Sequence, residues 1–207
     1  MKKSLVIAFV ALSSVLGYSQ GTVSFNNNVA FATPPSTTPG VGQVPANGHD
    51  NRLVYNTDNT TTLTGTNWAA QLYYKVGSGQ AESSLGIISG DTFSKFRVGT
   101  TSSPGTWSGA TKTFADVPIG TTATLQVRVW DGSLFGTYAL AVAGNGVTGK
   151  SVTFNYTPQD TTLPATPIDA SFMYGLQSFT VAVPEPSTIA LGILGAASLL
   201  VVRRRKQ

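Results

Sequence analysis

Chemically reactive side chains are scarce in this chain, which limits the reactions it can support. Among its 207 residues there are one His and no Cys. The absence of Cys excludes thiolate metal sites and disulfide frameworks, and a single His cannot form a cluster of imidazole ligands. His49 stands among polar residues without a Gly-x-Ser-x-Gly elbow, so a Ser-His-Asp triad is not indicated. We interpret His49 as a solvated loop residue.

Carboxylates are the remaining candidates for acid–base chemistry. Glu82 with Asp91, or Asp116 with Asp131, would suit glycoside hydrolysis if one acid had a raised pKa and the other stayed ionised. The sequence does not bring either pair together. Acids in surroundings rich in Gly, Ser and Thr usually form turns or caps. We therefore predict that the protein is not an enzyme, and a hydrolase is the least favoured alternative.

Calcium is the metal that loop carboxylates of exported β-domains can hold. Asp50, Asp58 and Asp131 lie in predicted loops, but no Asp-x-Asp-x-Asp run accompanies them. The sequence therefore predicts no metal site and no cofactor.

The three tryptophans are candidate ligand contacts. Trp68, Trp107 and Trp130 could form a flat platform for sugar rings if they were exposed together. Trp130 falls on the polar face of its predicted strand, and so does Tyr73. Packing in the core or at a sheet edge is the alternative, and it is the more usual place for aromatic residues in a β-domain. Exposure as one surface would favour carbohydrate binding.

Alternating hydrophobicity predicts the elements that must position these residues. Residues 122–130, 70–76 and 151–156 alternate with period two, as half-buried strands do, and 22–25 and 179–183 add a first and a last strand. Turn signals separate them. The predicted fold is all-β, an antiparallel β-sandwich of Ig-like or jelly-roll-like type, with a barrel as the alternative. One short helix is expected at residues 138–143, before a glycine.

The charge of the chain belongs to its ends. The formal net charge is +4, but six of the 13 basic residues lie in the two terminal segments. Between residues 20 and 183, seven basic and eight acidic residues give seven minus eight, or −1. No basic patch is available for counterion release, so nucleic acid is not a predicted partner.

The N-terminal segment is typical of a secretory signal peptide. Lys2 and Lys3 precede an apolar stretch, and Gly17 and Ser19 supply small residues before the expected cleavage site. We predict a signal helix over residues 1–19 and a mature chain that begins at Gln20.

A second apolar segment lies near the C-terminus. Residues 188–202 are predicted to form a hydrophobic helix, which would span about 22 Å against a hydrocarbon core of about 30 Å. Four basic residues follow it at once and keep that end cytoplasmic under the positive-inside rule. They are Arg203, Arg204, Arg205 and Lys206.

The order of these C-terminal features resembles the sorting signal of PEP-CTERM proteins. Pro184, Glu185 and Pro186 precede the apolar segment and the basic run, over about the last 25 residues. The resemblance implies export, transient anchoring in the inner membrane and processing by an exosortase-type enzyme near the Pro-Glu-Pro motif. These three residues would then be substrate residues of another enzyme. Proline also keeps such a strip extended and accessible.

The middle of the chain resembles a region shared by many exported proteins with this kind of signal. Residues 67–74 and 127–131 carry the resemblance, which implies a self-contained domain and assigns it no function. We divide the chain into a signal peptide (1–19), a β-sandwich domain (20–183) and a sorting signal (184–207). The predicted protein is structural or adhesive, at the cell surface or in the extracellular matrix. A carbohydrate-binding module for extracellular polysaccharide is the alternative.

Overall fold

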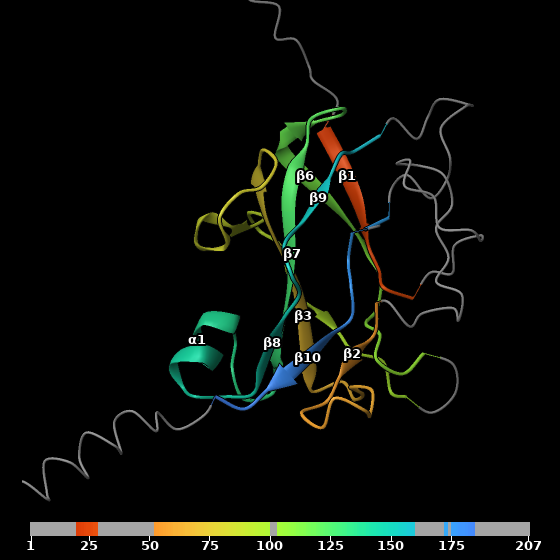
Figure 1. Ribbon diagram of the computed structural model, residues 1–207, viewed down its shortest axis with the longest axis vertical. Helices are drawn as coiled ribbons and strands as arrows, with labels where there is room; N and C mark the ends of the chain where they lie inside the picture. The colour runs from red at the N-terminus through yellow and green to blue at the C-terminus, as the bar shows by residue number, and fades with distance from the viewer. Residues whose placement is uncertain (1–19, 29–51, 100–102, 160–171, 174, 185–207) are drawn as a thin grey trace, which may run out of the picture.

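The computed structural model confirms a mostly β architecture. It describes residues 20–28, 52–99, 103–159, 172–173 and 175–184 (Figure 1). The predicted terminal helices, at 1–19 and 188–202, lie outside these residues. The elements follow the chain in this order: β1 (Gln20–Phe25), β2 (Val54–Tyr55), β3 (Trp68–Val76), the 3-10 helix η1 (Glu82–Ser84), β4 (Gly86–Ile87), β5 (Ser94–Lys95), β6 (Ala110–Pro118), β7 (Ala123–Asp131), α1 (Tyr138–Ala143), β8 (Thr148–Lys150), β9 (Phe154–Tyr156) and β10 (Phe179–Ala182).

The centre of the fold is the antiparallel pair of β3 and β7. These strands pair over their whole length, from Trp68 opposite Asp131 to Val76 opposite Ala123. They correspond to the two clearest alternating stretches in the sequence. The larger sheet continues in the order β2-β10-β8-β7-β3-β4, with β5 also pairing with β3 and β9 with β7. β2 and β10 are parallel, and the other pairs in this sheet are antiparallel.

A second sheet consists of β1 and β6. The sequence analysis did not predict β6 as a strand. Its alternation breaks because the register with β1 shifts between Gln20 and Thr22, so that Ala115 and Asp116 are both exposed. A bulge of this kind adds residues to one strand only and interrupts the period of two. The pattern-based prediction therefore missed a nine-residue strand.

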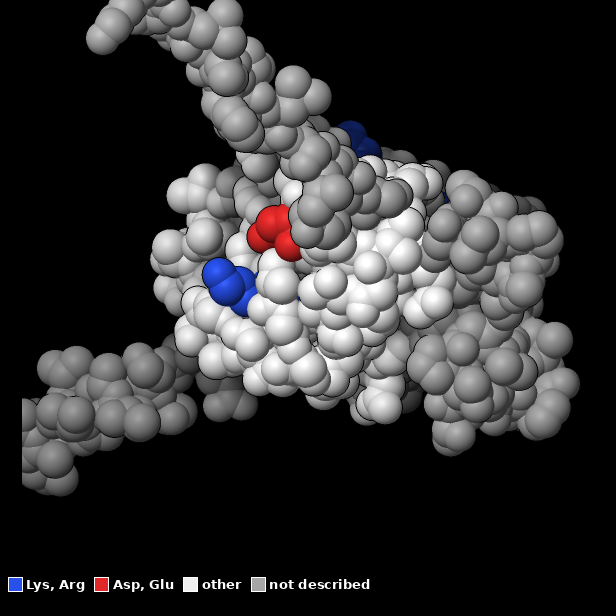
Figure 2. Space-filling view, turned by 90° about the horizontal axis from the view of Figure 1, so that it is seen from above, with Lys and Arg blue, Asp and Glu red and all other residues white. Residues whose placement is uncertain are grey.

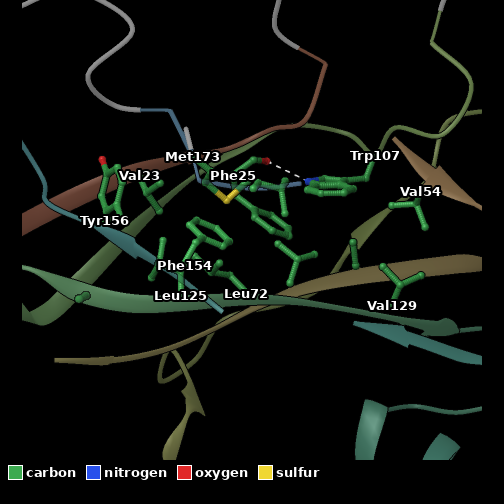
Figure 3. Packing of buried hydrophobic residues seen from close by; sticks show 14 of the residues in the cluster. Val23, Phe25, Val54, Leu72, Trp107, Leu125, Val129, Phe154, Tyr156 and Met173 are labelled. Atoms are coloured by element: carbon green, nitrogen blue, oxygen red, sulfur yellow. Dashed lines mark hydrogen bonds between the residues drawn. The ribbon is translucent and has the colours of Figure 1, made fainter. Parts of the chain in front are cut away.

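The main core lies between the two sheets, which makes the arrangement sandwich-like (Figure 3). Val23 and Phe25 of β1 and Phe114 of β6 pack in one cluster with the apolar face of β3 and β7. Trp107 is fully buried among them, and its indole N–H donates to the Phe25 carbonyl oxygen at 3.2 Å. Its ring centre lies 4.9 Å from that of Phe25. This hydrogen bond gives the buried indole N–H a partner, as is usual for a buried tryptophan.

The opposite face of β3 and β7 carries a smaller core beneath α1. Ala69, Trp130 and Ala141 form it, with Phe135 and Tyr138 partly buried against it. The Thr137 hydroxyl caps α1 by accepting from the Leu140 N–H at 3.2 Å, which satisfies one of the free donors of the first turn. The expected short helix at 138–143 is confirmed. Within the described part of the chain, no helix has the length and apolar character needed to cross a bilayer.

The strand predicted at 151–156 is shorter than expected. Only β9 (Phe154–Tyr156) and, before it, β8 (Thr148–Lys150) pair with β7. Ser151 interrupts the ladder because its hydroxyl, rather than its backbone carbonyl, accepts from the Val127 N–H at 3.0 Å. Val152, which the alternation placed toward the core, is 60% exposed.

Candidate functional site

The three tryptophans do not form one exposed surface. Trp107 and Trp130 have no accessible surface, and Trp68 is partly buried against the main core. Trp107 and Trp130 therefore pack in the core, which is the alternative that the sequence analysis gave, and the common exposure needed for a sugar platform is not met. Trp130 does lie on the face that alternation assigned to it, but α1 covers that face. Its indole N–H donates to the Phe135 carbonyl oxygen at 2.8 Å.

The first acid pair proposed from sequence is divided between two cations. Glu82 accepts from the Lys150 ammonium group at 2.6 Å, with both side chains about half exposed. Asp91 forms an ion pair with Lys112, and both of these side chains are nearly buried. The hydrogen bond from Lys150 lowers the pKa of Glu82, although burial opposes it. A general acid of a glycosidase needs a raised pKa, so Glu82 is poorly suited to that role.

The second acid pair also serves local structure. Asp116 accepts from the Tyr74 hydroxyl at 2.7 Å. Asp131 closes the turn after β7 by accepting from the Ser133 N–H at 2.9 Å and from the Ser133 hydroxyl at 2.5 Å. Burial acts to raise the pKa of Asp131, but the hydrogen bonds from Ser133, together with those from Asn67 and Leu134, outweigh it and the pKa is lowered. Asp131 is therefore a turn residue, as its position before a glycine indicated.

Asp58 shows the same pattern in an exposed turn. It accepts from the Thr60 and Thr61 N–H groups at 3.0 and 2.9 Å, and from the Thr61 hydroxyl at 2.6 Å. These bonds favour the ionised form and lower the pKa of Asp58 to about 2. Among the described residues, no three Asp, Glu, His or Cys side chains gather as a metal site would require. His49 and Asp50 lie outside those residues.

An aromatic and basic cluster on the outer sheet face was missed by the sequence analysis. We call it the outer-face cluster: Tyr73 of β3, Arg128 of β7 and Tyr138 of α1. The guanidinium carbon of Arg128 lies 4.0 Å from the ring centre of Tyr73 and 5.3 Å from that of Tyr138. All three side chains are partly exposed. The alternation had placed Tyr73 on this face, but only the folding of α1 over the sheet brings in Tyr138.

Hydrogen bonds hold Arg128 in this stacked position. Its Nε donates to the Gln126 side-chain oxygen at 2.8 Å, and its Nη2 donates to the Glu82 carbonyl oxygen at 3.2 Å. Burial raises the pKa of Tyr73, and the charge of Arg128 opposes that rise. An arginine stacked on tyrosine rings presents flat apolar faces beside a polar edge, which are the groups that contact sugar rings and their hydroxyls.

Charged side chains are otherwise dispersed. On the face drawn in Figure 2, few charged groups are visible, and an acidic group lies near a basic one among uncharged residues. This view offers no basic patch of the kind that binds a polyanion.

The processing motif begins where the described structure ends. β10 ends at Ala182, Val183 is 57% exposed and Pro184 is partly exposed. Glu185 and Pro186 lie outside the described residues, as do Arg203, Arg204, Arg205 and Lys206. The structure thus places the start of the motif directly after the last strand.

Comparison with known proteins identifies this C-terminal region and nothing else. Residues 182–206 match the family model of the PEP-CTERM protein-sorting motif. No curated protein and no solved structure matches the chain. The predicted resemblance is therefore confirmed for the C-terminal segment, and this signal indicates an exosortase-sorted protein that is exported to the cell surface or beyond.

Proposed function

We propose that the chain is a structural or adhesive protein of the cell surface or extracellular matrix, and that residues 20–183 are the delivered cargo. The position of the sorting motif supports this proposal, because the matched residues begin at the last residue of β10. A processing enzyme acting there would release the folded part without cutting its sheets. The two sheets are inferred to form a sandwich of the Ig-like or jelly-roll-like type.

The proposed route follows from the two ends. The signal peptide, 1–19, is removed during export. The apolar segment, 188–202, and the four basic residues after it then hold the chain transiently in the inner membrane. An exosortase-type enzyme recognises Pro184, Glu185 and Pro186 and separates the domain from this anchor.

A non-enzymatic role is supported by the state of the acids. Each candidate acid is held by a hydrogen bond or an ion pair, and the pKa is lowered at Glu82 and Asp131. Such acids stabilise turns and surfaces rather than donate protons at neutral pH.

Intact mass of the surface form tests the proposed route. In a host with the exosortase, the extracted protein should begin at Gln20 and lack Arg203 through Lys206. A chain with Pro184→Ala and Pro186→Ala should keep the tail and stay with the inner membrane. A wild-type surface form that still carries the tail would contradict processing.

Deletion of the chain tests the proposed role. If the protein is structural or adhesive, its deletion should leave the length of the extracellular polysaccharide unchanged. The amount of polysaccharide retained on the cells should fall. A change in polysaccharide length without a change in retention would instead indicate a hydrolase.

The outer-face cluster supports carbohydrate binding as a second candidate function. Tyr138→Ala should weaken retention of the full chain on the producer's polysaccharide, measured at a temperature where the variants remain folded, because the lost packing against Trp130 also lowers the melting temperature. Tyr74→Ala is the matched control, because Tyr74 faces the main core instead. Equal retention by both variants would argue against binding at the cluster.

A further inference from the structure

The outer-face cluster carries a positive charge that no carboxylate among the described residues neutralises. In that part of the chain, neither of the two ion pairs includes Arg128. The groups that accept hydrogen bonds from Arg128, the Gln126 side-chain oxygen and the Glu82 carbonyl oxygen, are uncharged. A guanidinium group has more N–H groups than these partners occupy, and they form a planar fork. Arg128 is therefore fixed in position with its charge uncompensated.

A second cation lies beside Arg128, but it already has a carboxylate partner. Lys150 of β8 is directly opposite Arg128 of β7 in the strand register, so both side chains leave the same face of the sheet. Glu82 of η1 accepts from the Lys150 ammonium group at 2.6 Å. The formal charges of these three side chains are two positive minus one negative, or +1. The net positive charge of this part of the sheet is thus that of Arg128.

The elements around the cluster hold its flat faces at the surface. In Figure 1, α1 and the yellow segment after β3, which includes η1, lie on the same side of the sheet. The ring centre of Tyr138 lies 6.3 Å from that of Trp130 beneath it and 6.3 Å from that of Tyr73. Tyr73, Arg128 and Tyr138 nevertheless stay partly exposed. The sheet and α1 therefore present aromatic faces and one unpaired cation side by side.

We propose that the outer-face cluster binds acidic sugars of the uronate class, with the sugar carboxylate on Arg128 and the sugar ring against Tyr138. This inference rests on carbohydrate binding, the second candidate function. A carboxylate is planar and accepts parallel N–H bonds from the guanidinium fork, whereas a neutral sugar brings no opposite charge. A single uncompensated cation suits one carboxylate rather than the consecutive phosphates of a nucleic acid.

Two matched oligosaccharides test the preference for an acid. The probes are trigalacturonate and its methyl ester, which have the same rings and linkages and differ in the charge of their carboxyl groups. Calorimetric titration of the full chain in a nonionic detergent measures both affinities. We expect the acid to bind about tenfold more tightly than the ester, because only the acid forms a charge-assisted pair with Arg128. Added NaCl should reduce this preference by screening the pair.

Two charge substitutions should move the preference in opposite directions. Arg128→Gln removes the unpaired cation, so the acid should then bind no better than the ester. Glu82→Gln leaves the backbone carbonyl that accepts from Arg128 in place and releases the charge of Lys150. The acid should therefore bind more tightly to Glu82→Gln, by about two- to fivefold, which is the range for an exposed charge pair. Binding of the ester should stay unchanged in both variants.

Lys95→Gln is the matched control for loss of a positive charge. Lys95 is exposed and pairs with Ala69, which lies four residues, or about 13 Å, along β3 from Tyr73. This variant should keep the wild-type preference for the acid. A preference that falls in Lys95→Gln but persists in Arg128→Gln would place acid binding elsewhere and overturn the inference.

The comparison of the two probes also separates this inference from carbohydrate binding itself. Equal affinity of the wild-type chain for acid and ester would overturn the inference and leave carbohydrate binding in place. Failure of both probes to bind would overturn the inference as well. Carbohydrate binding would fall with it only if the full chain also failed to retain the producer's polysaccharide. If Arg128→Gln does not fold, the wild-type preference and the gain in Glu82→Gln decide the question.

Discussion

Both faces of the β3–β7 pair carry buried side chains, but these are buried by different means. The inner face carries Leu72, Leu125 and Val127, which need only apolar neighbours. The outer face carries Thr124 and Gln126, which are just as inaccessible at 1% exposure. Polar alternation along a strand therefore marks its second face without showing that water reaches it.

Segments outside β3 and β7 supply hydrogen-bond acceptors for the buried polar side chains of the outer face. The Thr124 hydroxyl donates to the Gly77 carbonyl oxygen at 2.7 Å, and the Gln126 side-chain amide donates to the Ser151 carbonyl oxygen at 3.0 Å. A buried polar group without such a partner would cost about 1–3 kcal/mol. The inner face depends on volume and shape, whereas the outer face depends on hydrogen bonds.

The largest expected effect on the free energy of unfolding comes from the main core, on the inner face of the β3–β7 pair. Trp107→Ala should lower the free energy of unfolding by about 3–5 kcal/mol, because it leaves a cavity beside Phe25 and Phe96. Urea unfolding followed by circular dichroism measures this. Leu134→Ala, at an exposed site, should change stability by less than about 0.5 kcal/mol. Similar losses in both variants would show that the described core does not dominate stability.

Trp130→Ala compares the outer core with the inner one. The variant should lose about 3 kcal/mol of the free energy of unfolding, near the lower end of the same range. The loss is at the lower end because α1 can move into part of the cavity. The same unfolding experiment applies. If Trp130→Ala left stability intact and abolished polysaccharide retention, Trp130 would be a binding residue and its burial under α1 would be wrong.

Gln126→Leu separates hydrogen bonding from volume on the outer face. The substitution keeps side-chain bulk but leaves Nε of Arg128 and the Ser151 carbonyl oxygen without this partner. We expect a loss of about 1–3 kcal/mol. Leu125→Met is the inner-face control, because it conserves volume and should cost less than about 1.5 kcal/mol. A neutral Gln126→Leu would mean that the two faces obey the same rule.

The smallest expected effect concerns Tyr74, whose hydroxyl reaches from the edge of the inner face to Asp116. Burial first, and then the hydrogen bond to this carboxylate, raises the pKa of Tyr74 to about 12. Because the folded pKa lies above the value near 10 of an unfolded tyrosine, its contribution to stability is complete below pH 10 and disappears as the pH rises toward 12. Ultraviolet titration of Tyr74→Phe should lack a late-ionising tyrosine that the wild-type protein shows. An unchanged titration in that variant would assign the late ionisation to another residue.

Alternation predicted the strands that have one consistent inner face, and it failed where pairing was irregular. β3 and β7 were predicted within two residues at each end because their faces alternate without a break. β6 was missed because its bulge puts two exposed residues together, and 151–156 was overextended because Ser151 replaces a backbone bond by a hydroxyl bond. Neither irregularity has a local hydrophobic signature.

The C-terminal sorting motif, the scarcity of reactive side chains and the β class were determined by the sequence alone, since each depends on residue type and order along the chain. The tertiary structure decided the partners: which acid meets which cation, that Trp107 and Trp130 are covered, and that Tyr138 joins Tyr73 and Arg128. These contacts join segments far apart in the chain, and their energy depends on distance and burial. Both quantities exist only once the sheets have packed around the core.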